Sequence, residues 1–237
     1  MDDTKEESKP FSWTREDLQG LESFLSANRF AKYLGKTGGN REKAVRLYAW
    51  NTAVSAAFYG PLQALEVALR SRINTQLTKE YGAEWFNIDK TNMDFLHPNH
   101  FERLKNHLKR LERTEERFEN KQTPINPLNI IATLPFGFWV SFLTKHYEDK
   151  LWRPVLHKAF SHTHSRKKVH QPMDKMRRLR NRIAHHEPIF HLHLNYHYQL
   201  ILETIGQMSP KKRKWVEAHS RVKEVLAKSP NGSDIRF

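Results

Sequence analysis

Polar side chains that could perform acid–base chemistry gather in one short stretch, RLRNRIAHHEPIF, at residues 178–190. Arg180 and Asn181 stand four to five positions before His185 and His186, and Pro188 follows. A guanidinium and an amide can hold an anion, and an imidazole exchanges a proton near neutral pH. The chain has no cysteine, which excludes thiolate chemistry, and no glycine-rich phosphate loop, so nucleotide-binding folds lack support.

The element that must position these residues is an amphipathic helix over residues 169–186. At roughly 100° per residue its apolar side chains fall on one stripe. The stripe consists of Val169, Met173, Met176, Leu179 and Ile183. Arg180 falls inside the stripe, and an unpaired charge on an apolar face is costly. A purely structural ion pair with a carboxylate of another helix is therefore one open interpretation of Arg180.

Helical geometry separates the arginine from the first histidine. Arg180 and His185 point about 140° apart on an ideal helix, so a regular helix would not bring them to one ligand. A residue before proline avoids the helical region, so Pro188 predicts a helix end near His186. His185 would then lie in a frayed last turn, where the helix dipole favours a protonated imidazole. A second copy of the same helix is the alternative way to bring the two groups together.

The overall charge favours polyanionic partners. The formal net charge is +14 and the isoelectric point is about 9.9, which indicates nucleic acid or an anionic membrane surface. Three basic runs, SRKK at 165–168, KMRRLRNR at 175–182 and KKRK at 211–214, predict a surface that tracks phosphates, although a solvated charged face remains open. KKRK could also serve as a nuclear signal, but no other feature supports that.

The location follows from what the sequence lacks. The longest apolar stretch, NIIATLPFGFWVSFL, has about 15 residues and is interrupted by Pro135 and Gly137, so it is too short to span a bilayer. The N-terminus MDDTKEESKP is acidic and is no secretory signal. The absence of cysteine fits a reducing compartment. We expect a cytoplasmic protein without a membrane partner.

Helical periodicity dominates the chain and predicts an all-α fold. We expect a disordered tail over 1–12, one helical domain over 13–228 and a flexible tail over 229–237. Caps are predicted at Thr14, Asn40 and Ser209, and a kink or restart at Gly60-Pro61. The helices are expected from Thr14 to the glycines at 35–39, from Asn40 to YGAEWF, over 99–119, over 127–143 with a bend at Pro135, near 147–160, over 169–186, along the stripe from Leu194 to Met208, and from Ser209 to about Lys228.

RNRIAH resembles the R-x4-6-H signature of the HEPN superfamily, all-helical proteins of prokaryotic defence and toxin systems. RNRIAHH and the upstream phrase LEVALRSRI are similar to the Abi-like, or abortive-infection, branch, and so is MSPKKRKWVEAHSRVKEVL near the C-terminus. The resemblance covers about residues 15 to 228.

The resemblance implies a metal-independent endoribonuclease that needs no cofactor. Arg180 would hold the scissile phosphate, Asn181 would orient it, and His185 would be the general acid or base, with His186 as the alternative. The nucleophile would be the 2′-hydroxyl of the RNA. Where some relatives have tyrosine two residues after the histidine this chain has Glu187, so no nucleotidyl-transfer substrate is implied.

Partners follow from the same resemblance: RNA, a second copy of the chain, and an antitoxin or other defence partner. The candidate RNA contacts are Arg70, Arg72, Arg177, Arg178, Arg182, Lys211, Lys212 and Arg213. Two further hypotheses stay open. One is a catalytically inactive RNA- or protein-binding module of the same fold, and the other is a DNA-binding regulator, for which no helix-turn-helix spacing is found.

Two other groups of residues have competing interpretations. Glu66 and Arg70, four positions apart, could form an intrahelical ion pair, or Glu66 could reach across to Arg180 or shape the site. His193 and His197 could bind zinc or nickel, but no supporting carboxylate lies on that face. We therefore expect no metal site and a hydrogen-bonded, structural His197.

Overall fold

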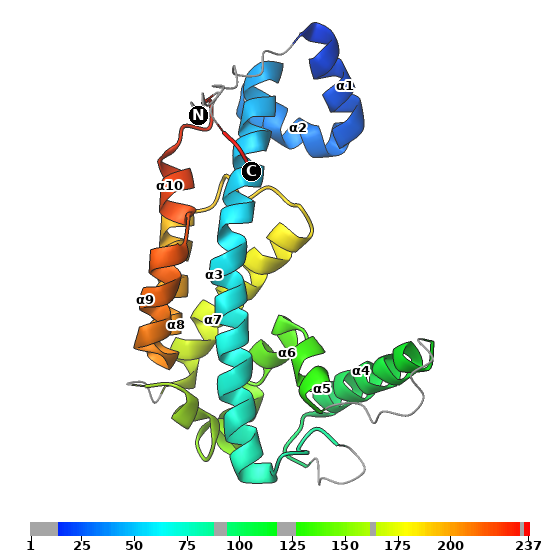
Figure 1. Cartoon of the computed structure of the whole chain (residues 1–237), viewed down its shortest axis with the longest axis vertical. Coiled ribbons are helices and arrows are strands. Elements are labelled where there is room, and N and C mark those ends of the chain that lie inside the picture. The colour runs from blue at the N-terminus through cyan, green and yellow to red at the C-terminus, as the bar shows by residue number, and fades with distance from the viewer. Residues whose placement is uncertain (1–13, 88–93, 118–126, 162–164, 233–234) are drawn as a thin grey trace, which may run out of the picture. The chain divides into compact units, whose positions relative to one another are not determined.

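A computed structural model describes residues 14–87, 94–117, 127–161, 165–232 and 235–237, which form helices joined by turns and loops, with no strand among them (Figure 1). The predicted all-α class is confirmed. The chain divides into two compact units. The first contains Met1–Gly60, Arg182–Tyr198 and Ser220–Phe237, and the second contains Pro61–Asn181 and Gln199–His219. The single domain over 13–228 stays a prediction, and the tail expected over 1–12 lies outside the described residues.

Ten α-helices and three irregular helical turns are present in the described part of the chain. In order they are α1 (Arg15–Leu25), α2 (Ala27–Lys36), α3 (Arg41–Tyr81), α4 (Pro98–Arg117), α5 (Pro127–Thr133), α6 (Phe136–Ser141), η1 (Lys145–Tyr147), η2 (Glu148–Trp152), η3 (Leu156–Ala159), α7 (Arg166–Ala184), α8 (Leu194–Met208), α9 (Pro210–His219) and α10 (Val222–Ala227).

The first unit begins with a capped helix, as predicted. The Thr14 hydroxyl accepts from the Asp17 N–H, and the Asp17 carboxylate accepts from the Thr14 N–H, which is a capping box. The expected continuous helix to the glycines is wrong, because Ser26 adopts φ 63° and separates α1 from α2. Asn40 caps α3 as predicted, with its side-chain oxygen 2.9 Å from the Lys43 nitrogen.

The C-terminal segment of the first unit is bound to the start of α3. The Trp50 indole N–H donates to the Lys228 carbonyl at 3.0 Å, and the Arg46 guanidinium donates to the Asn231 carbonyl at 3.0 Å. Trp50 is buried, so this indole needs the partner that it finds. The flexible tail over 229–237 stays a prediction, although its first residues make this contact.

Helix α3 runs through the position where a kink or restart was expected. Pro61 lies inside the helix and cannot donate to the carbonyl four residues earlier, and the boundary between the two units falls at Gly60 and Pro61. The helix ends at Tyr81 as predicted, followed by Gly82 at φ 90°, a conformation that favours glycine.

An aromatic cluster forms the core of the second unit. Trp85, Trp139 and Phe142 are fully buried with ring centroids about 6.2 Å apart. The Trp85 indole N–H donates to the Asn74 side-chain oxygen at 2.8 Å, which satisfies its only donor and ties the cluster to α3.

A set of hydrogen bonds links the start of α4 to α6 and to the turn η1 that follows it. The His97 N–H donates to the Tyr147 hydroxyl at 3.0 Å, and the ring of His100 contacts the Tyr147 and Ser141 hydroxyls through its two nitrogens. The Ser141 hydroxyl donates to the Phe138 carbonyl at 2.7 Å. Burial of His100 lowers its pKa to about 4, with Arg103 adding to the effect, so the ring is neutral at physiological pH.

Two sequence-based predictions need correction between residues 127 and 160. The helix expected over 127–143 is two helices, α5 and α6, because Pro135 interrupts it. The α-helix expected near 147–160 is a set of irregular turns, η1 to η3.

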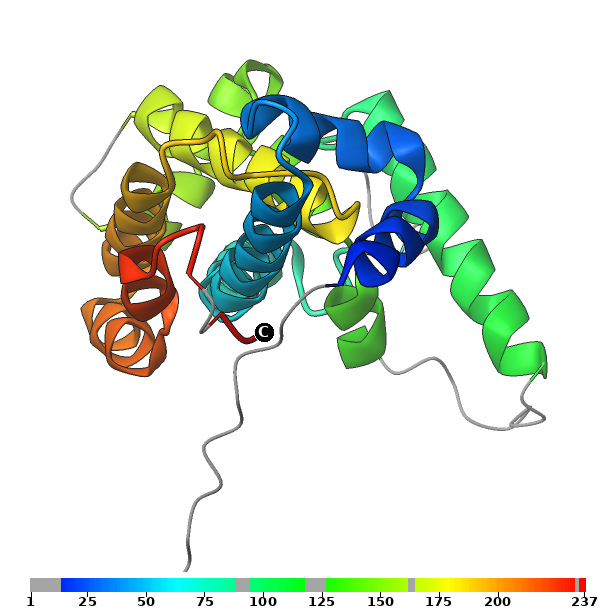
Figure 2. The ribbon, with the colours of Figure 1, turned by 90° about the horizontal axis from the view of Figure 1, so that it is seen from above.

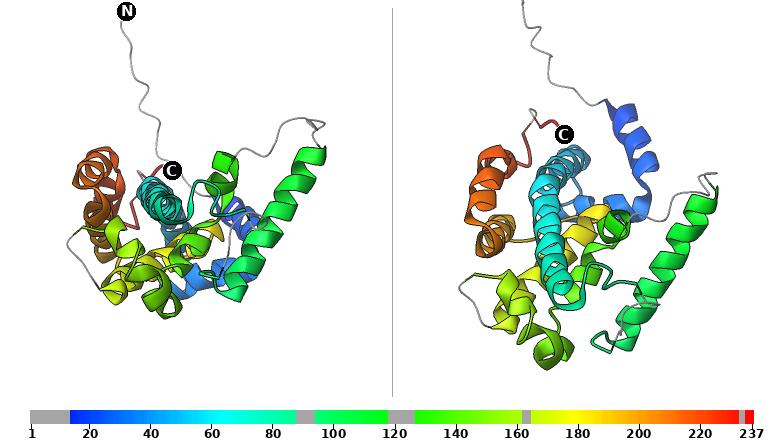
Figure 3. Two further views of the ribbon diagram at one scale, coloured as in Figure 1. Left: turned by 90° about the horizontal axis from the view of Figure 1, so that it is seen from below. Right: turned by 60° about the horizontal axis from the view of Figure 1, so that its bottom comes forward.

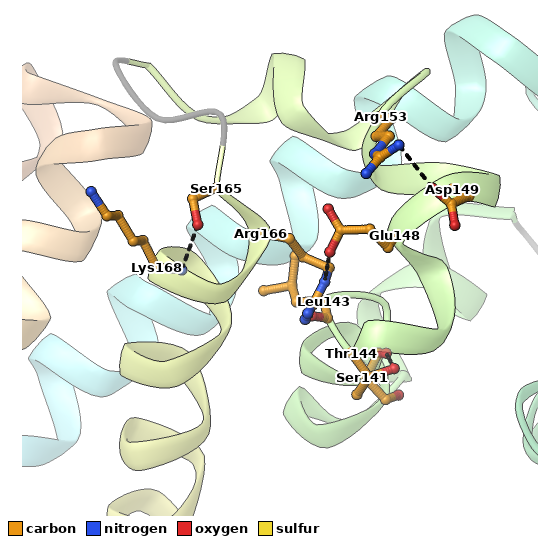
Figure 4. A network of polar contacts seen from close by, with 9 residues as sticks. All are labelled: Ser141, Leu143, Thr144, Glu148, Asp149, Arg153, Ser165, Arg166 and Lys168. Carbon is orange, nitrogen blue, oxygen red and sulfur yellow. Dashed lines mark hydrogen bonds and ion pairs between the residues drawn. The ribbon is translucent and has the colours of Figure 1, made fainter.

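Helix α7 begins at Arg166, earlier than expected, and is anchored there (Figure 4). The buried Arg166 guanidinium donates to the Glu148 carboxylate at 2.6 Å and to the Leu143 carbonyl at 2.6 Å. A buried cation is tolerated here because it is paired with a carboxylate and also donates to a backbone carbonyl.

The last helices divide at residues 220–221. The Ser209 hydroxyl accepts from the Lys212 N–H at 3.3 Å, which confirms the predicted cap of α9. The single helix expected to Lys228 is wrong, because α9 ends at His219 and α10 begins at Val222. Within the second unit, α9 lies beside the second half of α8 (Figures 2 and 3).

Candidate functional site at the end of helix α7

The apolar stripe of α7 is buried over four of its five predicted members, and the last, Ile183, is only half-buried. Val169, Met173, Met176 and Leu179 are at most 1% exposed. The Arg180 side chain is 43% exposed, so it lies at the edge of this buried face and not within it. The desolvation cost expected for a guanidinium inside the stripe is therefore largely avoided.

Arg180 forms one loose ion pair with α3. Its Nε lies 3.7 Å from the Glu66 carboxylate, beyond hydrogen-bonding distance. In the described residues no hydrogen bond occupies the two terminal nitrogens of Arg180, so the fork of the guanidinium can receive another anion. A half-exposed pair of this kind contributes about 0–1 kcal/mol to stability. The hypothesis that Glu66 reaches Arg180 agrees with this contact.

Two of the predicted RNA contacts, Arg70 and Arg72, lie on the second half of α3 and donate to backbone carbonyls. Arg70 donates to the Ala132 carbonyl, so the intrahelical pair with Glu66 is not what occupies it. Arg72 donates to the Met208 carbonyl at the end of α8. Both side chains tie α3 to other helices of the second unit, and their roles as RNA contacts stay predictions.

A Schellman motif terminates α7. The Glu187 N–H donates to the Arg182 carbonyl at 2.8 Å, and the His186 N–H donates to the Ile183 carbonyl at 3.0 Å. His186 has φ 54°, the left-handed conformation that this motif requires. The Arg182 guanidinium lies 3.5 Å from the Glu187 carboxylate, where many such motifs have a hydrophobic contact. His185 is the capping residue, in an ordered helix end and not in a frayed turn.

The segment after the histidines is fastened to α3 by Asn51. Its side-chain oxygen accepts from the Ile189 N–H at 2.8 Å and from the Phe190 N–H at 3.1 Å. Asn51 is 5% exposed, and Pro188 is buried. The Phe190 ring packs against Tyr33 of α2, with centroids 5.2 Å apart. This anchor was missed, although an amide within the otherwise apolar run AWNTAVSAAFY was a signal for it.

The members of the RNRIAHH stretch belong to both units. Arg180 and Asn181 end Pro61–Asn181, the first segment of the second unit, whereas His185 and His186 belong to the first unit. Asn181 is half-buried, and both histidines are exposed. Beyond them, burial lowers the pKa of His191, with Arg182 and Lys32 adding to the effect, so His191 favours its neutral form.

Two of the predicted RNA contacts on α7 share one carboxylate. Arg177 and Arg178 both donate to Asp174, at 2.7–3.0 Å. Partial burial raises the pKa of Asp174, but these hydrogen bonds hold it below its ordinary value. The side chain of Arg177 also packs over Gly137. Arg178 is 73% exposed and remains accessible to a phosphate.

The predicted contacts on α9 differ in their surroundings. Lys211 is exposed, and Lys212 and Arg213 are half-buried. Burial lowers the pKa of Lys212. Arg213 lies across Gly206 of α8, where its Cδ is 3.0 Å from the position of an added Cβ.

The histidine-rich segment at the start of α8 makes a local contact. His197 Nδ1 lies 2.9 Å from the His193 carbonyl, so this nitrogen donates and only Nε2 could bind a metal. Within the described ranges no group of three or more histidine or carboxylate side chains is arranged to hold a metal ion. No described helix is long and apolar enough to cross a membrane.

The fold and the candidate site define an all-α protein that combines a half-exposed guanidinium with exposed imidazoles at the end of one helix. The chain belongs to the Abi-like protein family, whose model matches residues 18–191. This membership connects it with abortive infection, a form of phage defence. No curated protein and no solved structure matches the chain.

Proposed function

We propose that this protein is a metal-independent endoribonuclease of an abortive-infection or toxin system. The observation that carries the proposal is the half-exposed Arg180 guanidinium, whose Nε lies 3.7 Å from the Glu66 carboxylate. Its terminal nitrogens can make the forked, two-point contact that a phosphate favours. Arg180 holds the scissile phosphate and stabilises its developing charge, and Asn181 orients it.

His185 is the proton-transfer group of the proposed reaction. It is exposed, and its backbone is held at a defined helix end by the Schellman motif and, beyond it, by Asn51. An imidazole can remove the proton of the 2′-hydroxyl or protonate the leaving oxygen. The 2′-oxygen forms a bond to phosphorus as the bond from phosphorus to the 5′-oxygen breaks. The products are a 2′,3′-cyclic phosphate and a 5′-hydroxyl, with no metal and no protein nucleophile.

Partners of the proposed enzyme are RNA, a second copy of the chain, and an antitoxin or defence partner that restrains it in the cell. The exposed Arg178 and Lys211 and the net charge of +14 support an RNA partner. We further propose a cytoplasmic location, where RNA is available.

The test is cleavage of a labelled RNA in the presence of EDTA. The wild type should cleave RNA, leave a 2′,3′-cyclic phosphate, and spare DNA of the same sequence. Arg180→Lys should lose most of the activity, because an ammonium cannot make the forked contact. His185→Ala should be inactive and folded. Activity that requires added zinc or manganese would refute the mechanism, and a wild type without activity would leave the inactive binding module as the better hypothesis.

A further inference from the structure

Helix α9 exposes a tryptophan within its basic run. Trp215 is 57% exposed, whereas Trp50, Trp85, Trp139 and Trp152 are at most 7% exposed. Large aromatic side chains are mostly buried on average, so one on a charged helix needs an explanation. The buried residue of α9 is Val216, which holds the helix against the protein without the indole.

Two lysines share the exposed face with Trp215. At 100° per residue, Lys211 and Lys214 lie within about 100° of Trp215 around the helix axis. Both lysines are exposed. Across the described residues no ion pair involves Lys211 or Lys214, so the charge of these two exposed lysines is available to a partner.

The imidazole of His219 packs against the indole of Trp215. The two rings stack with centroids 5.0 Å apart and planes inclined by 30°. His219 Nδ1 lies 2.8 Å from the Trp215 carbonyl, so its N–H donates there and the imidazole is held in place. The indole is therefore already held in a stack, so its side chain would lose little further freedom when a planar group stacks on its exposed surface.

We propose that Trp215 is a stacking platform for a base of single-stranded RNA, with Lys211 and Lys214 contacting the adjoining phosphates. Exposed aromatics beside cations are the usual means by which proteins bind single strands without reading sequence. A membrane surface fits less well, because an interfacial helix needs a broad apolar face and the neighbours of Trp215 on its face are lysines. The inference deepens the proposed function, on which it rests for the choice of RNA.

The test measures binding without cleavage. The probe is a 2′-O-methyl oligouridylate of about 12 nucleotides, which lacks the free 2′-hydroxyl that the proposed cleavage needs. It is titrated into the full chain while tryptophan fluorescence is recorded. Stacking should quench the emission of the exposed indole. Trp215→Ala should abolish this quenching and weaken binding about tenfold, whereas Trp215→Phe should restore most of the affinity.

Two controls make the result specific. Phe24→Ala removes an 85% exposed aromatic from α1, which has no basic run, and should bind like the wild type. Lys214→Ala should lower the slope of log affinity against log salt by about 0.7, the loss of one single-strand phosphate contact.

Three outcomes would overturn the inference: unchanged binding by Trp215→Ala, equal quenching by duplex RNA, or quenching by phosphatidylserine vesicles and not by the oligonucleotide. The two proposals fail separately. If Trp215 proves not to bind the strand, the proposal of Arg180- and His185-dependent cleavage of ordinary RNA still stands. An absence of cleavage leaves the Trp215-dependent binding of the 2′-O-methyl strand intact.

Discussion

Removing the Asn51 side chain should loosen the end of the candidate site. Asn51→Ala leaves two N–H groups, those of Ile189 and Phe190, without their acceptor. Asn51 and Ile189 are buried, so water does not readily replace the lost partner. An unsatisfied buried N–H costs about 1–3 kcal/mol. Because Phe190 is partly exposed, we expect the free energy of unfolding to fall by about 2–4 kcal/mol in total.

Urea unfolding measures this loss, and hydrogen exchange locates it. The amides of Ile189 and Phe190 should exchange faster in Asn51→Ala than in the wild type. Asn51→Asp keeps an oxygen acceptor and should lose less stability. The matched control is Thr52→Ala, because the Thr52 hydroxyl donates to the Tyr48 carbonyl within α3 and its loss leaves no buried donor unsatisfied. Equal stability losses in Asn51→Ala and Thr52→Ala would refute the anchoring role.

Three further predictions concern pH, the helix end and assembly. Because the pKa of His100 is lowered in the folded protein, the unfolded chain binds this proton first as the pH falls. The free energy of unfolding should therefore decline by about 3 kcal/mol between about pH 6.5 and 4 and then level off. Urea unfolding across this range should show a shallower decline for His100→Asn, and an unchanged decline would contradict the assignment. Glycine adopts the left-handed backbone of residue 186 without strain, so His186→Gly should be at least as stable as the wild type, whereas His186→Val should be about 1–2 kcal/mol less stable. A stable but inactive His186→Gly in the RNA assay would make His186 the acting histidine. If the active protein is a dimer whose sites draw on both chains, mixing Arg180→Ala with His185→Ala should restore part of the cleavage. A protein that is a monomer by light scattering and fully active in the cleavage assay would exclude that assembly.

Much of the helical pattern was predictable because its causes are local. Thr14, Asn40 and Ser209 cap helices where a short polar side chain precedes an apolar periodic run. The stripe of α7 is buried as its spacing required from Val169 to Leu179, whereas Ile183 at its end is half-buried. The errors arose where local signals were weak or misleading. Ser26 breaks a helix without glycine or proline, and Pro61 fails to break one.

The candidate site was predictable in its residues but not in its surroundings. The types and spacing of Arg180, Asn181 and His185 identified the stretch. Its anchor, Asn51, lies 138 positions before Ile189 in the sequence, and no periodicity relates the two. The same holds for His100, whose buried position depends on the hydroxyls of Ser141 and Tyr147. Such pairings depend on how helices pack, which single-sequence patterns do not encode.

By itself the sequence determined the all-α class, the basic character and the residues able to do chemistry, because helical periodicity, net charge and side-chain type are properties of short segments. Only the tertiary structure decided that Arg180 is half-exposed beside Glu66, that His186 turns left-handed to close α7, and that Trp215 stays outside the core. The physical reason is the same in each case. Burial and hydrogen-bond satisfaction depend on which distant segments meet, and their free energies are settled only in the packed chain.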